Sequence, residues 1–216
     1  MHMDELKSQK IWLCWNYETR KGKRTKVPIS ASGTATGTNS EYAHTWVTYD
    51  EAIKAADKHG YNGVGFTIPQ GYFFLDIDHK ELTDPFVQLM LERFNSYAEY
   101  SVSGGGIHIY GKCDIDRVPT YLDKGEKLRL DKAFYMKNPH NSTELYCGGI
   151  TNRFAVYTGN VIRNVLLKEC TDALLVTLDK DMRRKQKVKY SEKRDGDDRE
   201  PFDIRSMRSI VKAPYG

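Results

Sequence analysis

The sequence contains few cysteines, and none of them is closely paired. Its 216 residues include four, Cys14, Cys113, Cys147 and Cys170, and no CxxC or CxxH motif occurs. Structural zinc sites and disulfide frameworks both require characteristic cysteine spacings, so we expect neither, and no zinc as a cofactor. Isolated thiols fit a protein of the reducing cytoplasm.

Long apolar runs are also missing. No segment approaches the roughly 20 apolar residues that a membrane-spanning helix needs, and the N-terminus lacks the apolar core of a signal peptide. The sequence has no heptad pattern and no internal repeat. We therefore expect a cytoplasmic monomer with no membrane partner. The net charge is only +4, which permits an acidic partner such as nucleic acid without requiring one.

The residues that are present indicate an α+β protein. With 39% hydrophobic residues the chain can bury a full core, and we expect one main domain over residues 1–182. Strand and helix patterns alternate in a way that suits a mixed or antiparallel sheet. Strands are predicted at 11–18, 63–68, 72–78, 99–113 (two short strands), 142–148 and 153–160, and helices at 48–60, 84–95 and 163–182. We expect 63–68 to form a hairpin with 72–78, and 142–148 to pair with 153–160.

Two segments are much more polar than the rest of the sequence, and the second is followed by the last predicted helix. Residues 20–40 are basic and then rich in Gly, Ser and Thr, which predicts a mobile surface loop. Its Lys23, Arg24 and Lys26 are candidate contacts for nucleic-acid or nucleotide phosphates, or a solvated run of charge. Residues 183–202 are almost wholly charged and predict a linker, followed by a short helical appendage at 203–216.

Two aspartates end the apolar segment FFLDIDHK at 73–80. Because side chains alternate along a strand, Asp76 and Asp78 are expected to share one face, while Leu75 and Ile77 anchor the other. Two like charges on one face repel, unless a divalent cation such as magnesium lies between them. A solvated strand end explains an isolated DxD pattern equally simply, so both interpretations stay open on this segment alone.

A glycine-rich segment, SVSGGGIHIYG at 101–111, places His108 on the face opposite two isoleucines. Backbone N–H groups around Gly105, the Ser103 hydroxyl and His108 form a plausible cradle for phosphate oxygens. An ordinary hairpin turn beside an ordinary histidine is the alternative.

A third segment, TELYCGGITNRFAVYTGN at 143–160, carries Glu144 within a predicted strand and Arg153 at the start of the next. A carboxylate in such a position needs a reason, because charges are seldom buried unpaired. A functional acid and a surface ion pair are both consistent with the segment.

Together the three segments resemble the archaeo-eukaryotic primase superfamily, and most closely the primase-polymerase domains of phage, plasmid and prophage replication proteins. The likeness covers about residues 8–160, since WLCWNYE, KRTKVPIS, TWVTYDEA and GVGFTI also resemble the N-terminal part of phage-type primases. It implies an RRM-like sheet, the palm, at about 71–160, and a smaller N-terminal α/β unit at about 8–70. The resemblance therefore predicts a nucleotidyltransferase active in the DNA replication of a phage, prophage or plasmid, inside a prokaryotic host cell.

The resemblance also implies roles for individual residues. Asp76, Asp78 and Glu144 match the acidic ligands of a two-metal site for Mg²⁺ or Mn²⁺. Ser103, Gly105 and His108 match the motif that holds the phosphates of the incoming nucleotide, and Arg153 is a candidate to add charge there. The expected partners are a single-stranded DNA template with its primer, (d)NTPs, and a helicase domain in a longer parent chain.

Three other functions were weighed against this one. An RNA-recognition-type sheet can bind single-stranded nucleic acid without catalysis, but three carboxylates on its face would repel the phosphates in the absence of metal. A relaxase-like nuclease needs a tyrosine nucleophile and paired histidines, which His79 and His108 do not provide. A primase that has become a structural or origin-binding module is disfavoured by the intact acidic residues.

Overall fold

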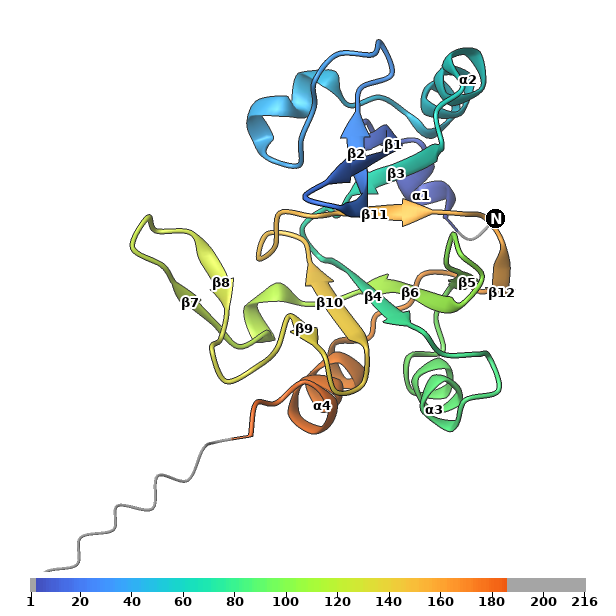
Figure 1. Cartoon of the computed structure of the whole chain (residues 1–216). Helices are drawn as coiled ribbons and strands as arrows, with labels where there is room; N and C mark the ends of the chain where they lie inside the picture. Colours follow the sequence, from blue (N-terminus) through green and yellow to red (C-terminus); the bar gives the residue numbers. More distant parts are fainter. Residues whose placement is uncertain (1–2, 186–216) are drawn as a thin grey trace, which may run out of the picture. The chain divides into compact units, whose positions relative to one another are not determined.

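The strands of this protein form two antiparallel sheets and a ribbon. The computed structural model describes residues 3–185. One sheet has four strands in the order β11-β3-β1-β2, the other has six in the order β12-β5-β6-β4-β10-β9, and β7 pairs with β8 (Figure 1). The strands are β1 (Trp12–Arg20), β2 (Lys23–Ile29), β3 (Gly63–Thr67), β4 (Tyr72–Asp78), β5 (Ala98–Tyr100), β6 (Gly106–Lys112), β7 (Thr120–Leu122), β8 (Leu128–Leu130), β9 (Lys137–Asn138), β10 (Thr143–Cys147), β11 (Phe154–Tyr157) and β12 (Val161–Arg163). The predicted α+β class is confirmed.

Two of the four α-helices within residues 3–185 begin at capping signals that the sequence displays. The four helices are α1 (Asp4–Lys7), α2 (Tyr49–His59), α3 (Pro85–Phe94) and α4 (Thr171–Asp181), with 3-10 turns at Ser40–Thr45 and Ile115–Arg117. A capping box of Thr48 and Glu51 opens α2, and Gly60 in the left-handed region closes it. The Asp84 side chain accepts a hydrogen bond from the backbone N–H of Phe86 at the start of α3. Helix α4 begins at Thr171, later than predicted: Arg163 ends β12, and residues 164–170 form an irregular connection.

The two faces of β4 pack against different layers. Phe73, Leu75 and Ile77 join one apolar cluster with residues of α3 and α4, whereas Phe74 joins a second cluster with Trp12 and other residues of the four-stranded sheet. Phe74, Asp76 and Asp78 alternate with the first set, so they occupy the face of the six-stranded sheet that is directed toward the four-stranded sheet. The predicted shared face of the two aspartates is confirmed.

The predicted loop at 20–40 is wrong in its first half, because Lys23–Ile29 forms β2 and pairs with β1 over seven residues. β2 lies at the edge of its sheet, where basic residues and Pro28 are tolerated and protect against unwanted pairing. Lys23, Arg24 and Lys26 therefore belong to an ordered strand. The basic composition reflects an edge strand rather than a mobile segment.

The two predicted local strand pairs are also wrong. β3 pairs with β1 and β11, whereas β4 pairs with β6 and β10, so neither predicted pair lies within one sheet. The chain crosses between sheets at residues 68–71, where Gly148 lies directly against Pro69: a Cβ on Gly148 would lie 1.9 Å from the Pro69 carbonyl oxygen. Only glycine permits this approach of the two connections.

Some predictions concern the chain beyond residue 185 or the division into units. Most of the predicted linker at 183–202 and all of the predicted helix at 203–216 lie outside the described residues. The boundary between an N-terminal unit and a palm stays a prediction, although β11, from beyond residue 150, pairs with β3 in the four-stranded sheet. No helix within residues 3–185 is long and apolar enough to span a membrane.

Candidate active site

Polar side chains form a row across five strands of the six-stranded sheet. Lys137 on β9 is paired with Glu144 on β10, Glu144 with Asp76 on β4, Asp76 with His108 on β6, and His108 with Glu99 on β5. Directly paired residues on one face have their Cβ atoms about 5 Å apart. The register of four antiparallel pairings thus gathers residues from three distant parts of the chain, near residues 76, 99–108 and 137–144.

An aromatic row supports the polar row from one side. Phe74 pairs with Tyr146 and Tyr110, and its ring centroid lies 6.1 Å and 5.0 Å from theirs. Tyr97 extends the row, with a centroid 5.8 Å from that of Tyr110. These rings are buried and limit the positions that the neighbouring polar side chains can take.

Asp76 stands at the centre of the row, between Glu144 and His108. Its side chain is only 19% exposed, and its Oδ1 atom is the one buried side-chain oxygen or nitrogen within residues 3–185 that has no hydrogen-bond partner. Burial is the main cause that raises its pKa from 3.8 to about 6, opposed by His108 and reinforced by Asp78 and Glu144. A carboxylate kept in such a place is costly unless a cation joins it.

His108 lies between two carboxylates. Its Nδ1 atom is 3.2 Å from Oε1 of Glu99, and its Nε2 atom is 3.7 Å from Oδ1 of Asp76. The histidine side chain is 2% exposed and the glutamate side chain is fully buried. The ring is therefore held in one orientation, with one nitrogen directed at the candidate catalytic carboxylate.

Glu99 was not predicted as a site residue, although it is the most completely satisfied acid in the region. It accepts hydrogen bonds from the backbone N–H groups of Thr158 and Gly159, both at 2.9 Å, and from the hydroxyl of Tyr110 at 2.8 Å. The local pattern showed only an acidic residue in a predicted strand, and the donors that mark Glu99 come from residues 158 and 159.

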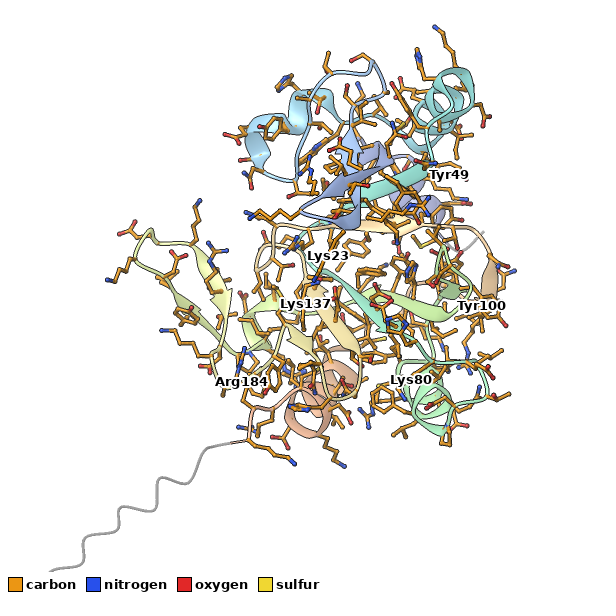
Figure 2. All side chains as sticks on the ribbon, in the orientation of Figure 1. Lys23, Tyr49, Lys80, Tyr100, Lys137 and Arg184 are labelled. Atoms are coloured by element: carbon orange, nitrogen blue, oxygen red, sulfur yellow. The ribbon has the colours of Figure 1, made fainter. Side chains whose placement is uncertain are left out.

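Glu144 is engaged by two neighbours. Lys137 Nζ lies 2.5 Å from its Oε1 atom, and the Tyr146 hydroxyl donates to its Oε2 atom. Burial and the nearby glutamate raise the pKa of Tyr146, so its hydroxyl remains a donor. Lys137, labelled in Figure 2, was not predicted either.

The row borders a cavity of about 510 Å³ between the two sheets. Asp76, His108 and Glu144 line one side, while Arg24 and Lys26 of β2 and Arg153, just before β11, line the others. The cavity has the size of a small-molecule site, and it brings carboxylates and cations together. Six of the predicted site residues meet in it.

Four predicted residues do not line this cavity. Asp78 lies on the same face as Asp76, two residues further along β4, where it pairs with Gly106. Ser103 and Gly105 lie in the turn between β5 and β6, and the Gly105 N–H donates to the Ser103 hydroxyl oxygen at 3.3 Å. Lys23 is the first residue of β2, directly after the turn from β1, and pairs with Arg20.

The carboxylate side chains of this site are suitable ligands for a divalent cation. Hard cations prefer carboxylate oxygens, and the unpartnered oxygen of Asp76 is such a ligand. Within the described part of the chain, no three His, Cys, Asp or Glu side chains already form a metal-binding group as they stand. Glu144 is turned to Lys137 and Tyr146, which accounts for its absence from such a group.

Comparison with known proteins adds an independent finding. A scan against protein-family models finds no match. The chain is 28% identical over 129 residues to a protein named DNA Primase-polymerase from Nitratiruptor phage NrS-1. The chain is a relative of a phage primase-polymerase. This confirms the resemblance that the motifs predict.

The match to this primase-polymerase covers 55% of the present chain and 17% of the relative. The matched part of the chain thus spans less than a fifth of the length of that protein. The relative's name supports a primase-polymerase type of domain. The fold specific to the archaeo-eukaryotic primases, and the roles of single residues, stay predictions.

Proposed function

We propose that this chain is a template-dependent DNA primase-polymerase domain that transfers a nucleotide from a (d)NTP to a primer 3′-hydroxyl or an initiating nucleotide. The observation that carries the proposal is the row of Glu144, Asp76 and His108 at the cavity between the sheets. The phage relative supports the same class of reaction. As a domain of a replication protein, it would act beside a helicase domain in a longer parent chain.

Asp76, Asp78 and Glu144 would hold Mg²⁺ or Mn²⁺. When bound, such ions make a hydroxyl more nucleophilic and neutralise the charge of a triphosphate and its leaving group. The raised pKa of Asp76 and its unpartnered oxygen both favour a site completed by a cation. Lys137 would act as a stand-in charge at Glu144 until the site is filled.

The basic wall of the cavity suits the triphosphate. Arg24, Lys26 and Arg153 lie within reach of one cavity of nucleotide size. Lys26 and Arg24 also rest on aromatic rings, with Arg24 Cζ 3.6 Å from the Tyr17 ring centroid, which limits their freedom before a ligand binds. Ser103 and Gly105 would contact the nucleotide from the β5–β6 turn beside Asp78.

His108 would orient the phosphates by donating a hydrogen bond, and it would not ligate a metal ion. Glu99 anchors its Nδ1 side, so Nε2 is the nitrogen available to the Asp76 side of the cavity. A donor at this position stabilises negative charge on phosphate oxygens. Glu99 is then a positioning residue for the histidine.

The proposal is tested by extension of a labelled primer on a single-stranded template, with dNTPs or NTPs and with Mg²⁺ or Mn²⁺. Wild type is compared with Asp76→Asn and Asp78→Asn, and with Asp57→Asn on the exposed side of α2 as a matched control. We expect metal-dependent extension by wild type and the control, and a loss of at least about 100-fold in both site variants. Omission of the primer then tests priming.

The alternative function is a non-catalytic module that binds single-stranded nucleic acid. The basic lining of the cavity favours some affinity for phosphate in either case. Binding of the oligonucleotide without extension under any of these conditions would support the module and contradict the enzyme.

A further inference from the structure

A second cavity, of about 600 Å³, lies beside the β7–β8 ribbon. Its lining includes Tyr121 of β7, Arg129 of β8, Lys132, Arg153 and Arg184. Figure 1 shows the ribbon on the side of the sheet where β9 and β10 lie, and Figure 2 labels Arg184 close to the foot of that ribbon. The cavity shares Asn152 and Arg153 with the candidate active site, so the two hollows meet at the loop between β10 and β11.

The second cavity is positively charged. Four cationic side chains line it, and no carboxylate is among its lining residues. Arg129 is paired with Asp123, at 2.7 Å, but within residues 3–185 no acidic side chain forms an ion pair with Lys132, Arg153 or Arg184. Three cations that face one cavity attract a ligand with several negative charges.

Arg184 is held in place before any ligand binds. Its Nε atom donates to the Phe134 carbonyl oxygen at 3.1 Å, and its guanidinium carbon lies 4.2 Å from the Tyr135 ring centroid. Its terminal N–H groups are thereby available for a phosphate at little cost in side-chain entropy.

Tyr121 supplies an aromatic face. The tyrosine is half-buried, and Lys132 Nζ lies 4.8 Å from its ring centroid. Phe134, by contrast, is buried beneath Arg183 and is not accessible for stacking. A partly exposed aromatic ring flanked by cations is a combination with which proteins bind single-stranded nucleic acids. The ring can stack on an unpaired base, whereas the bases of a duplex do not expose their faces, and the cations contact the phosphates.

We propose that this second cavity binds single-stranded DNA and leads it past Arg153 into the active site. Tyr121 stacks against a base, and Lys132 and Arg184 contact phosphates on either side. The inference rests on the proposed function for its direction, because a template must enter next to the reacting nucleotide. The evidence for DNA binding itself comes from the residues that line the second cavity and does not depend on the proposed function.

The test measures binding of a fluorescein-labelled 20-nucleotide oligo(dT) by anisotropy at several salt concentrations, with the full 216-residue chain. The variants are Lys132→Ala/Arg184→Ala, Lys132→Glu, Tyr121→Ala and Tyr121→Phe. The matched control is Lys54→Ala/Lys58→Ala, which removes two exposed cations from α2, outside both cavities. Thermal unfolding of each variant checks that the fold is kept.

We expect Lys132→Ala/Arg184→Ala to bind more weakly than wild type. The plot of log K against log salt concentration should be shallower, its negative slope smaller in magnitude by about 1.4, because about 0.7 is lost for each phosphate contact on a single strand. Tyr121→Ala should weaken binding by about 5- to 100-fold, whereas Tyr121→Phe retains it because stacking needs only the ring. The control should bind as wild type does.

Failure of this inference differs from failure of the proposed function. Wild type that binds through these residues but never extends a primer supports the DNA site and contradicts the polymerase. Wild type that extends primers, with variants that bind and extend equally well, overturns the DNA site and leaves the polymerase standing. Absence of oligo(dT) binding by wild type overturns the inference as well.

Discussion

Replacing Asp76 by asparagine should make the metal-free protein more stable while it removes catalysis. The reason is the raised pKa of this carboxyl group, from 3.8 to about 6, caused mainly by burial. At neutral pH and above, the folded protein carries an ionised side chain that its surroundings disfavour. Asparagine has nearly the same shape without the charge.

The magnitude follows from the pKa difference. One pKa unit corresponds to about 1.4 kcal/mol, so the ionised Asp76 costs the folded state about 3 kcal/mol at pH 8. Because the folded-state pKa lies above the unfolded value, this cost is absent below pH 3.8, grows between pH 3.8 and about 6, and is constant above that. For a protein of this size, 3 kcal/mol raises the melting temperature by about 6–12 °C.

The assay is thermal or urea unfolding of wild type and Asp76→Asn in EDTA at pH 4 and pH 8. We expect near-equal stability at pH 4 and a more stable variant at pH 8, with Asp57→Asn indistinguishable from wild type at both. Added Mg²⁺ should stabilise wild type by mass action, and the variant much less. A variant that is less stable than wild type at pH 8 would refute the reasoning, because it would mean that ionised Asp76 is already well accommodated.

Three further outcomes follow from the same contacts. Glu99→Gln should lower the free energy of unfolding in urea by about 1–3 kcal/mol, because an amide N–H₂ would face groups that all donate; equal stability would contradict the hydrogen bonds described. Lys137→Ala should lower the Mg²⁺ concentration needed for half-maximal primer extension, because it frees Glu144. The same substitution should lower the free energy of unfolding by less than about 1 kcal/mol. A higher Mg²⁺ requirement would instead show that the lysine assists the ion. A thiol reagent should label the native protein slowly and should label all four cysteines after unfolding. Each cysteine is buried, and burial raises the pKa of the Cys14 and Cys170 thiols to about 11. Rapid labelling of the native protein would contradict this burial.

Local patterns predicted much of the fold. The alternation of FFLDID placed Asp76 and Asp78 on one face of a strand, and the capping signals located α2 and the start of α3. These features depend on residues a few positions apart, which the sequence displays directly. The β2 strand was missed because edge strands tolerate the basic, proline-containing composition that also marks loops.

Non-local pairing was the part that local patterns left open. Strands β3 and β4 are adjacent in sequence and apolar, yet they join different sheets, and β10 and β11 do the same. The resemblance, rather than spacing, suggested that Glu144 belongs with Asp76; the register of β10 against β4 places the two residues opposite each other. Glu99 was missed because its significance depends on donors more than 50 residues away, the Thr158 and Gly159 backbone N–H groups.

The most direct test of the central claim is single-nucleotide incorporation on four primed templates that differ only in the first unpaired base. Each template is offered each dNTP separately, with Mg²⁺ and with Mn²⁺, to wild type and to Asp76→Asn. We predict that wild type adds the complementary nucleotide on each template and that Asp76→Asn adds none. Addition that ignores the template base, or equal addition by Asp76→Asn, would contradict a template-dependent polymerase centred on this carboxylate.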